Sequence, residues 1–337
     1  MKRIGIEIDG GAIRSVVRRR QGVVCAPFVP KGKQRAALTL PGEALRIAHI
    51  PLPFKRSASF KKGAHAHVAR LFPEMASDAV ILPRCRSGDT TTLFITTRKD
   101  VSRSIDEAVR LKIDAEQIVP LQYALSAFAS THLATRTPLL LLHISEEATF
   151  AIAILEGKAM ETAQIDIGMR DWGAAMEQDG GDLADLESLE ELDPADHAEL
   201  FSLQSRFRNE ISRLLAYREK QGDTPLAGGL ITGSGARLPF LDTALDALLP
   251  TLSFSSRELR EYAAPLGLVY ADTAACDVRR PVLPHPSRMR RCLTSALALI
   301  AAAGASLFSF QYAKQVACEG LQRDIAAHTA LIQQHLP

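Results

Sequence analysis

The sequence predicts an α/β protein with two lobes, followed by a single membrane-spanning helix. Residues 4–17 alternate apolar and polar side chains around two central glycines, which indicates a β-hairpin with a tight tip. Residues 138–158 show strand, turn and strand, and residues 228–239 form an apolar strand that runs into a glycine-rich turn. Near the C-terminus, residues 292–313 contain no charged side chain.

The tight turns supply the candidate binding residues. Glycine has no Cβ, so backbone amides at these turns can approach a ligand closely. The candidate binding residues at these turns are Glu7, Asp9, Gly10, Gly11, Thr232, Gly233, Ser234 and Gly235.

Composition indicates a globular body and excludes several classes of function. The chain has 337 residues, of which 47% are hydrophobic, and a net charge of +2, so its length favours two lobes and its charge gives no case for nucleic acid. Its five cysteines show no CxxC pair or zinc-like spacing, which fits a reducing compartment and predicts no metal site.

Known catalytic motifs are missing from the sequence. It contains no HExxH pair of histidines, no GxSxG nucleophile elbow and no Walker A loop. We therefore expect no enzymatic activity and assign no catalytic residues.

Residues 292–313 are expected to span the membrane. Twenty-two residues at about 1.5 Å each can cross a hydrocarbon core of roughly 30 Å. Five arginines precede this run, whereas Lys314 and Arg323 are the only nearby cations after it, so the positive-inside rule places the N-terminal body in the cytoplasm. A long core helix of the globular body is the alternative.

The segments on either side of this span have their own expected roles. Residues 273–291, rich in Pro and Arg, are expected to form a linker, and residues 314–337 a short extracytoplasmic tail. Small residues recur every four positions in the span, which would allow a homodimer. From Cys318 onward, apolar residues recur at alternating spacings of three and four, which indicates a short coiled-coil seam; a frayed tail is the alternative.

The interior of the chain adds helices and one acidic segment. Residues 100–111 and 122–131 show helical spacing, and a basic helix-like stretch lies between residues 51 and 73. Residues 177–199 contain ten carboxylates, which predicts a solvated, partly mobile insertion near residues 175–200. Such a segment could also dock a basic partner surface.

The three turn-bearing segments, in this order, resemble the phosphate and adenosine turns of actin-like proteins. The resemblance implies that the candidate binding residues form a weak or vestigial nucleotide cleft. The strand and helix pattern between them resembles the PilM family of type IV pilus assembly and the cytoplasmic region of the GspL family of type II secretion. The resemblance implies an actin-like (ribonuclease H-like) fold. Its first lobe, with an inserted subdomain, would cover residues 1–135 and its second lobe residues 136–272.

The sequence departs from this family at the residues that handle phosphate. The family's first-hairpin Asp is Glu7 here and its following Gly is Asp9, while the second hairpin has His143 and Ser145 in place of Asp and Gly. Carboxylates beside a polyphosphate weaken its binding unless a metal bridges them. We expect the fold to be kept and hydrolysis lost; the alternative is that Glu7 and Asp9 hold Mg²⁺ for slow ATP hydrolysis.

The resemblance implies a single-pass bacterial inner-membrane scaffold with a cytoplasmic N-terminal domain. Its partners would be a cytoplasmic secretion or pilus ATPase and platform proteins of the PilN/PilO or GspM type, with no cofactor. A nucleotide-switched, weakly ATP-hydrolysing actin-like protein is the alternative function, and a sugar kinase of the same fold is a more distant one.

Overall fold

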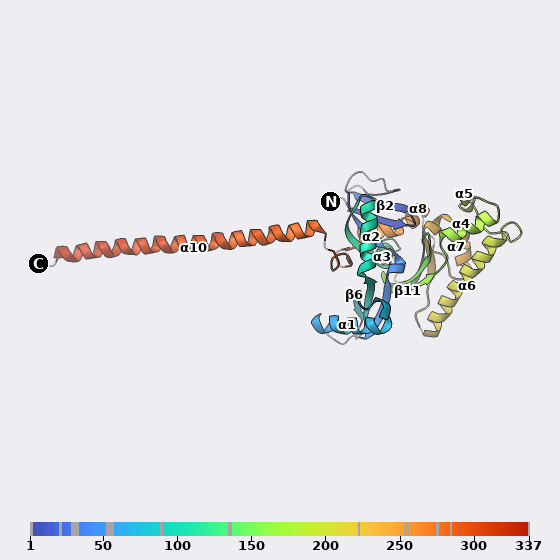
Figure 1. The fold of residues 1–337 in the computed structure, drawn as a ribbon, viewed down its shortest axis with the longest axis horizontal. Coiled ribbons are helices and arrows are strands. Elements are labelled where there is room, and N and C mark those ends of the chain that lie inside the picture. Colours follow the sequence, from blue (N-terminus) through green and yellow to red (C-terminus); the bar gives the residue numbers. More distant parts are fainter. Residues whose placement is uncertain are drawn as a thin grey trace. The chain divides into compact units, whose positions relative to one another are not determined.

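The computed structural model describes residues 3–19, 22–27, 34–51, 57–87, 90–133, 137–221, 223–252, 254, 256–273, 276–283 and 285–335. The chain forms two compact units, Met1–Leu283 and Pro284–Pro337. The first contains both lobes and the second is helical (Figure 1).

The first lobe is built on a five-stranded sheet in the order β3-β2-β1-β4-β8. The expected hairpin is confirmed, with Asp9 opposite Ala12 across a tip where Gly10 and Gly11 take positive φ angles of 55° and 99°. Such angles favour glycine, because a Cβ strains the left-handed region. The strands are β1 (Arg3–Asp9), β2 (Ala12–Arg19), β3 (Gly22–Pro27), β4 (Gln34–Leu40) and β8 (Ile113–Pro120).

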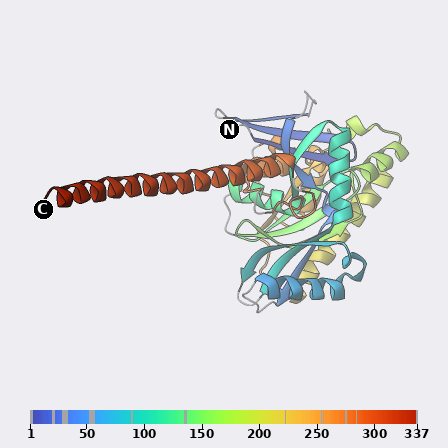
Figure 2. The same ribbon diagram turned by 60° about the vertical axis from the view of Figure 1, so that its left-hand side comes forward.

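A small subdomain is inserted between β4 and β8 (Figure 2). Its sheet, in the order β5-β7-β6, packs with α1 around a core of its own that includes Ile50, Val68 and Leu93. The elements are β5 (Arg46–Pro51), α1 (Ser57–Leu71), β6 (Ala79–Ser87) and β7 (Thr90–Thr97), and α2 (Arg98–Arg110) leads back to the first lobe.

The second lobe is built on a four-stranded sheet in the order β11-β10-β9-β12. Its strands are β9 (Leu139–Ile144), β10 (Thr149–Leu155), β11 (Lys158–Ile165) and β12 (Gly228–Gly233). All six residues of β9 are buried, because neighbouring side chains enter different cores: Leu140 and Leu142 join one cluster and Leu141 another. A strand covered on both faces has a continuous apolar run rather than an alternating one.

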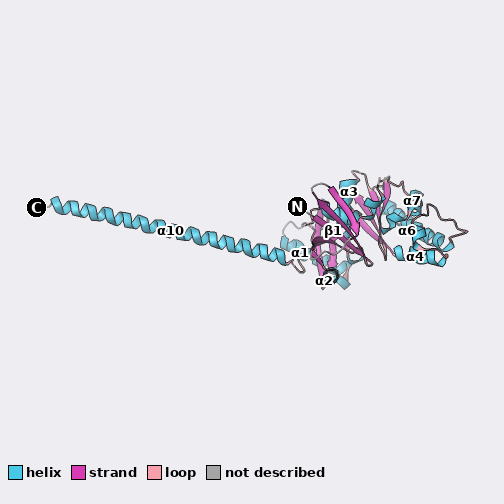
Figure 3. Ribbon diagram, turned by 90° about the horizontal axis from the view of Figure 1, so that it is seen from above, coloured by secondary structure: helices cyan, strands magenta, loops and turns pink. Residues whose placement is uncertain are grey.

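Helices cover the two faces of this second sheet. Trp172 of α4, Phe207 of α6 and Phe240 of α7 form edge-on aromatic contacts on one face, where these helices lie in Figure 3. On the other face, Leu125 and Phe128 of α3 pack with α9. The bounds are α3 (Leu121–His132), α4 (Met169–Gln178), α6 (Ala198–Gln221), α7 (Pro239–Asp246) and α9 (Ala263–Tyr270).

Helices α3 and α9 cross in close backbone contact between the sheets. A Cβ at Gly267 would overlap the carbonyl oxygen of Ala124, and one at Gly5 of β1 would overlap the carbonyl oxygen of Pro265. Both positions therefore require glycine, and this contact joins the two lobes.

The segment expected to be a linker is packed against the first lobe over part of its length. Val278 donates its N–H to the carbonyl of Ile118 at 2.9 Å, and Asp277 Oδ1 accepts the N–H of Ile118 at 3.2 Å. Because β8 is an edge strand, these bonds satisfy backbone groups that would otherwise be open. Within the expected linker, residues 276–283 are therefore packed against the first lobe, and Val278 is fully buried.

The acidic segment, residues 177–199, makes more contacts with the rest of the second lobe than a solvated insertion was expected to make. Asp179 accepts the N–H groups of Glu199 and Leu200, both at 3.1 Å, and so caps the start of α6, while Asp182 caps the short helix α5 (Leu183–Leu186). Leu186 is fully buried and anchors the segment. Several carboxylates thus serve as caps, although most of them are exposed.

The second unit contains one helix, α10 (Pro286–His335). Within it, Ala296–Ala326 is long and apolar enough to cross a membrane, and none of its most apolar window is buried. The helix continues past residue 313 instead of fraying there. Cys318, Leu321 and Ile325 of the expected seam are exposed, while His328 and Ile332 lie outside the described side chains.

Candidate functional site

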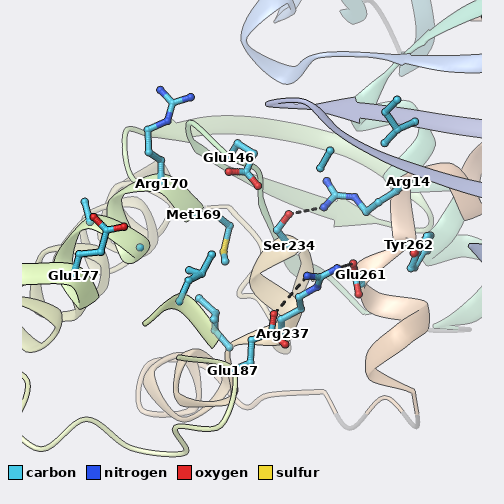
Figure 4. Close-up of a pocket in the computed structure, with 16 residues that line it drawn as sticks. Arg14, Glu146, Met169, Arg170, Glu177, Glu187, Ser234, Arg237, Glu261 and Tyr262 are labelled. Atoms are coloured by element: carbon cyan, nitrogen blue, oxygen red, sulfur yellow. Dashed lines mark hydrogen bonds and ion pairs between the residues drawn. The ribbon is translucent and has the colours of Figure 1, made fainter. Parts of the chain in front are cut away.

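Arg14 is the centre of a buried polar cluster where the two lobes meet. Its guanidinium donates from Nε to Glu7 Oε2 at 3.0 Å, from one terminal nitrogen to Asp9 Oδ2 at 2.7 Å, and from the other to Ser234 Oγ. Figure 4 shows the Arg14–Ser234 contact. Arg14 is only 5% exposed, so these partners replace water around its charge.

His143 extends this cluster into the second lobe. Its Nε2 lies 2.8 Å from Glu7 Oε1 and its Nδ1 lies 3.2 Å from Thr232 Oγ1. An ionised carboxylate only accepts hydrogen bonds, so Nε2 carries the hydrogen that bonds Glu7. The ring therefore links the first hairpin to the end of β12.

The charges of the cluster keep Glu7 ionised. Burial alone would raise the pKa of Glu7, but the nearby Arg14 charge and the hydrogen bond from His143 outweigh it and lower the pKa to about 2. Burial disfavours the charged form of Arg14 as well. Glu7 and Asp9 outweigh burial and raise the pKa of Arg14 above its ordinary value. Two carboxylates thus share one guanidinium inside the protein.

The tips of the two hairpins touch. The N–H of Glu146, in the β9–β10 turn, donates to Asp9 Oδ1 at 2.9 Å. A Cβ at Gly10 would overlap the Glu146 side chain. Burial and the charge of Asp9 raise the pKa of the Glu146 carboxyl, which has no ion-pair partner among the described residues. Protein atoms therefore fill the space between the tips.

This contact separates two cavities. One, of about 550 Å³, is lined by Arg14, Glu146 and Ser234 together with α4 and the turn after β12. The other, of about 270 Å³, is lined by Glu7, Asp9 and His143 and by residues near α2. No lining residue is shared, so the Arg14 cluster is the wall between them.

The predicted site residues are only partly brought together. Glu7, Asp9, Thr232 and Ser234 belong to the Arg14 cluster. Gly233 has a φ of 75°, and a Cβ there would lie 2.6 Å from the carbonyl oxygen of Ile144, so it shapes the turn. Gly10 and Gly235 make room for neighbouring side chains, whereas a Cβ at Gly11 would have nothing within 4 Å.

Arg14 and His143 were not predicted as members of the site. Arg14 had a detectable signal, because a hairpin with its tip at Gly10 and Gly11 places it directly opposite Glu7. His143 was noted only as a departure from the family's second hairpin, and its contact with Glu7 had no local signal, because the two residues are 136 positions apart.

The arrangement of the two lobes is the actin-like fold. It matches a solved structure described as the PilM–PilN type IV pilus biogenesis complex with a TM-score of 0.60 at 16% identity, covering 84% of this chain and 99% of that one. At this identity the likeness shows the fold alone.

Two other solved structures are more distantly similar. MreB 5 of Spiroplasma citri bound to AMPPNP gives a TM-score of 0.45 at 14% identity, covering 79% and 94% of the two chains. The cytoplasmic domain of EpsL, an inner membrane component of the type II secretion system of Vibrio cholerae, gives 0.37 at 9% identity, covering 49% and 71%. No protein-family model and no curated protein sequence matches the chain.

The residues present do not fit the Mg-nucleotide that this fold implies. A polyphosphate would have to lie between hairpin tips that are in contact, next to the ionised Glu7 and the unpaired Glu146. Arg14 already neutralises part of the charge that a metal would balance. Among the described residues, no group of three or more His, Cys, Asp or Glu side chains could hold a metal ion.

Proposed function

We propose that this chain is a non-hydrolytic, actin-like scaffold anchored in the bacterial inner membrane, with its two-lobed body in the cytoplasm. In a type II secretion or type IV pilus-like machine it would link a cytoplasmic secretion ATPase to platform proteins of the PilN/PilO or GspM type. The observation that supports the proposal is the Arg14 cluster, which puts the protein's own charges at the hairpin that would face phosphate if the resemblance holds.

A scaffold needs lobes that hold one arrangement without a nucleotide. The hydrogen bond from Glu146 to Asp9, the Arg14–Ser234 contact and the His143–Glu7 contact all join the first lobe to the second. Fully satisfied buried polar networks fix one arrangement of the groups around them. Nucleotide binding is therefore not needed to close the lobes.

Two further features support a membrane-bound assembly role. The unburied apolar stretch Ala296–Ala326 of α10 supplies a candidate anchor. The fold is shared with a protein of the PilM–PilN type IV pilus biogenesis complex, which makes a pilus or secretion machine the favoured setting.

Calorimetry with Mg-ATP on the full-length chain in lipid nanodiscs tests the non-hydrolytic part. We expect no binding heat up to about 1 mM ATP and no phosphate release above background, because the two hairpin tips are in contact and carry carboxylates. Micromolar binding would overturn the proposal in favour of the nucleotide switch. Asp9→Asn is the control: phosphate release that this variant leaves unchanged comes from a contaminating ATPase.

Cross-linking in native membranes tests the scaffold part. A tagged full-length chain should cross-link to both a cytoplasmic ATPase and an integral membrane protein. A variant whose residues 292–313 are replaced by an unrelated membrane span should still cross-link to the ATPase. Recovery of neither class of partner would contradict the scaffold role even if ATP binding is absent.

A further inference from the structure

The first-lobe sheet has a basic end, which lies at the opposite end of its strands from the hairpin tip. Arg3, the first residue of β1, is paired with Arg18 of β2, and Arg35 lies two residues before Ala37, which is paired with Gly5 of β1. Paired residues lie side by side in a sheet, so these cations gather at one edge. The exposed cations at this basic end are Arg3, Arg18, Arg19, Arg35 and, in the turn that leads into β8, Lys112.

No acidic side chain neutralises these five cations within the described part of the chain, where none of them forms an ion pair. Arg3 and Arg18 donate to the carbonyls of Ala271 and Val269, both at 3.4 Å, and the Arg18 guanidinium lies 4.5 Å from the centre of the Tyr270 ring. These neutral partners hold the two side chains in place without cancelling their charge. The basic end is therefore an unneutralised surface that is partly fixed in shape.

The charge of the whole first lobe has the same sign. Residues 1–137 contain 23 Lys and Arg and 11 Asp and Glu, a net charge of +12, whereas residues 138–272 contain 10 Lys and Arg and 24 Asp and Glu. Asp114 and Glu116 of β8, together with Asp272, offset part of the charge at the basic end. The carboxylates of Glu7 and Asp9 lie at the other end of β1, so the two ends of this lobe differ in sign and anions are attracted to the basic one.

The segment that follows the second lobe also ends at the basic end. Arg279 donates to the carbonyl of Ala115 in β8 and, at 3.0 Å, to the carbonyl of Leu283, which is the last residue of the two-lobed unit. Ala115 is paired with Ala36, the neighbour of Arg35. Leu283 is therefore held close to the basic end, although the sequence reaches it from the acidic second lobe.

The uncharged run begins soon after this point. Nine residues separate Leu283 from Cys292, the first residue of the run, and fully extended they cover about 30 Å. A bilayer that holds the run thus stays within reach of the basic end, and such a tether raises the local concentration of lipid headgroups. The connection itself carries further positive charge, from Arg280, Arg288, Arg290 and Arg291.

We propose that the basic end of the first lobe docks on anionic lipid headgroups of the membrane that holds α10. The cytoplasmic surface of a membrane is negative and attracts clustered Lys and Arg side chains next to a span. Docking would turn the hairpin tips, at the other end of the strands, toward the cytoplasm. The inference rests on the proposed function, because it needs an anchored chain with a cytoplasmic body.

Lysine acetylation measures the contact on the full-length chain. The chain is placed in nanodiscs of phosphatidylcholine, alone or with about 40% phosphatidylglycerol, and treated with the N-hydroxysuccinimide ester of acetic acid. Mass spectrometry then gives the rates at Lys112 and at Lys99, an exposed lysine at the other end of α2. We expect anionic lipid to slow Lys112 at least fivefold and Lys99 less than twofold, and about 0.5 M salt to abolish the difference. Equal rates at Lys112 in the two lipids would overturn the proposal.

A pair of double variants separates the basic end from general attraction. Arg19→Gln with Arg35→Gln should remove most of the slowing at Lys112. Arg206→Gln with Lys220→Gln takes the same charge from exposed positions of α6 and should leave the slowing within twofold of the parent chain. Equal losses in both double variants would contradict a localised surface. The urea midpoints of both must match the parent chain, so that a change in rate is not a change in folding.

Two other outcomes lead to different conclusions. Release of the chain from neutral nanodiscs by about 1 M salt would count against the membrane anchor and so against the proposed function. The rate at Lys112 with anionic nanodiscs would then decide the docking separately. Slow acetylation of Lys112 in neutral nanodiscs, together with a dimer on size-exclusion chromatography, would assign the basic end to the acidic segment of a second copy and overturn the lipid assignment.

Discussion

The backbone N–H of Glu146 donates a 2.9 Å hydrogen bond to Asp9 Oδ1, and this bond joins the hairpin tips of the two lobes. In the sequence, Asp9 was expected to oppose phosphate by its charge. The structure shows that Asp9 instead accepts hydrogen bonds from the opposite hairpin and from Arg14. The Asp9 carboxylate thus stabilises the contact between the lobes.

Replacing Arg14 with Ala should be strongly destabilising. The change leaves Glu7 and Asp9 buried without their cation, and breaking a buried pair in this way costs about 3–5 kcal/mol. Urea unfolding followed by the fluorescence of the single tryptophan, Trp172, measures the free energy of unfolding. Arg19→Ala, an exposed cation on the same strand, should stay within about 0.5 kcal/mol of the parent chain.

A neutral version of the cluster gives the complementary test. Arg14→Met combined with Glu7→Gln and Asp9→Asn removes all three charges and should recover at least half of the stability that Arg14→Ala loses. A triple variant no more stable than Arg14→Ala would show that the hydrogen-bond geometry, not the balance of charge, is what stabilises the site.

Stability should fall with acidification between pH 4.5 and 2 because of Glu7. The pKa of Glu7 is about 2 in the folded protein against an ordinary value of 4.5, so in this window the unfolded chain binds the extra proton. The folded state therefore loses stability as pH falls, by about 1.4 kcal/mol per pH unit from this group. Glu7→Gln should flatten the measured slope by that amount.

Glu146 provides a control of opposite sign for the same measurement. Burial and Asp9 raise its pKa in the folded protein, so protonation favours folding and stability decreases as pH rises through the window above 4.5. Glu146→Gln should remove that decrease and leave the slope below pH 4.5 unchanged. A Glu146→Gln slope that matched Glu7→Gln below pH 4.5 would contradict both assignments.

Gly267→Ala should be among the most damaging single changes in the body. The added Cβ would overlap the carbonyl oxygen of Ala124, a backbone atom that cannot rotate away, so helices α3 and α9 must separate. We expect a loss of at least about 3 kcal/mol or failure to fold. Circular dichroism of thermal unfolding measures it, and a loss below about 1 kcal/mol would contradict the close crossing.

The matched control is Gly173→Ala in α4. There the nearest atom to the new Cβ is Leu183 Cδ1 at 3.4 Å, an ordinary contact. Alanine is a better helix former than glycine, so this variant should gain up to about 1 kcal/mol.

The fold was predictable from local patterns, whereas the chemistry of the site was not. Alternation in residues 4–17 and the apolar run of β12 are local signals, and the structure confirms both elements. His143 could not be assigned to Glu7, because its contact depends on the packing of one lobe against the other. The packing of residues 276–283 could not be predicted for a related reason: their Pro and Arg content is typical of a linker, but Asp277 and Val278 form hydrogen bonds with Ile118 at the edge of β8.

The side of the membrane on which Cys318 lies can be measured with a membrane-impermeant maleimide. The apolar stretch Ala296–Ala326 has 31 residues, more than the roughly 20 that a hydrocarbon core needs. Because Lys314 and Glu319 are charged, we expect the span to end near residue 313 and Cys318 to lie outside the cytoplasm.

The maleimide should then label Cys318 in intact spheroplasts, and Cys318→Ser should abolish the signal. The cysteines of the body, Cys25 and Cys276 among them, should react only after lysis. Labelling of Cys318 only after lysis would place the tail in the cytoplasm and reverse the proposed orientation.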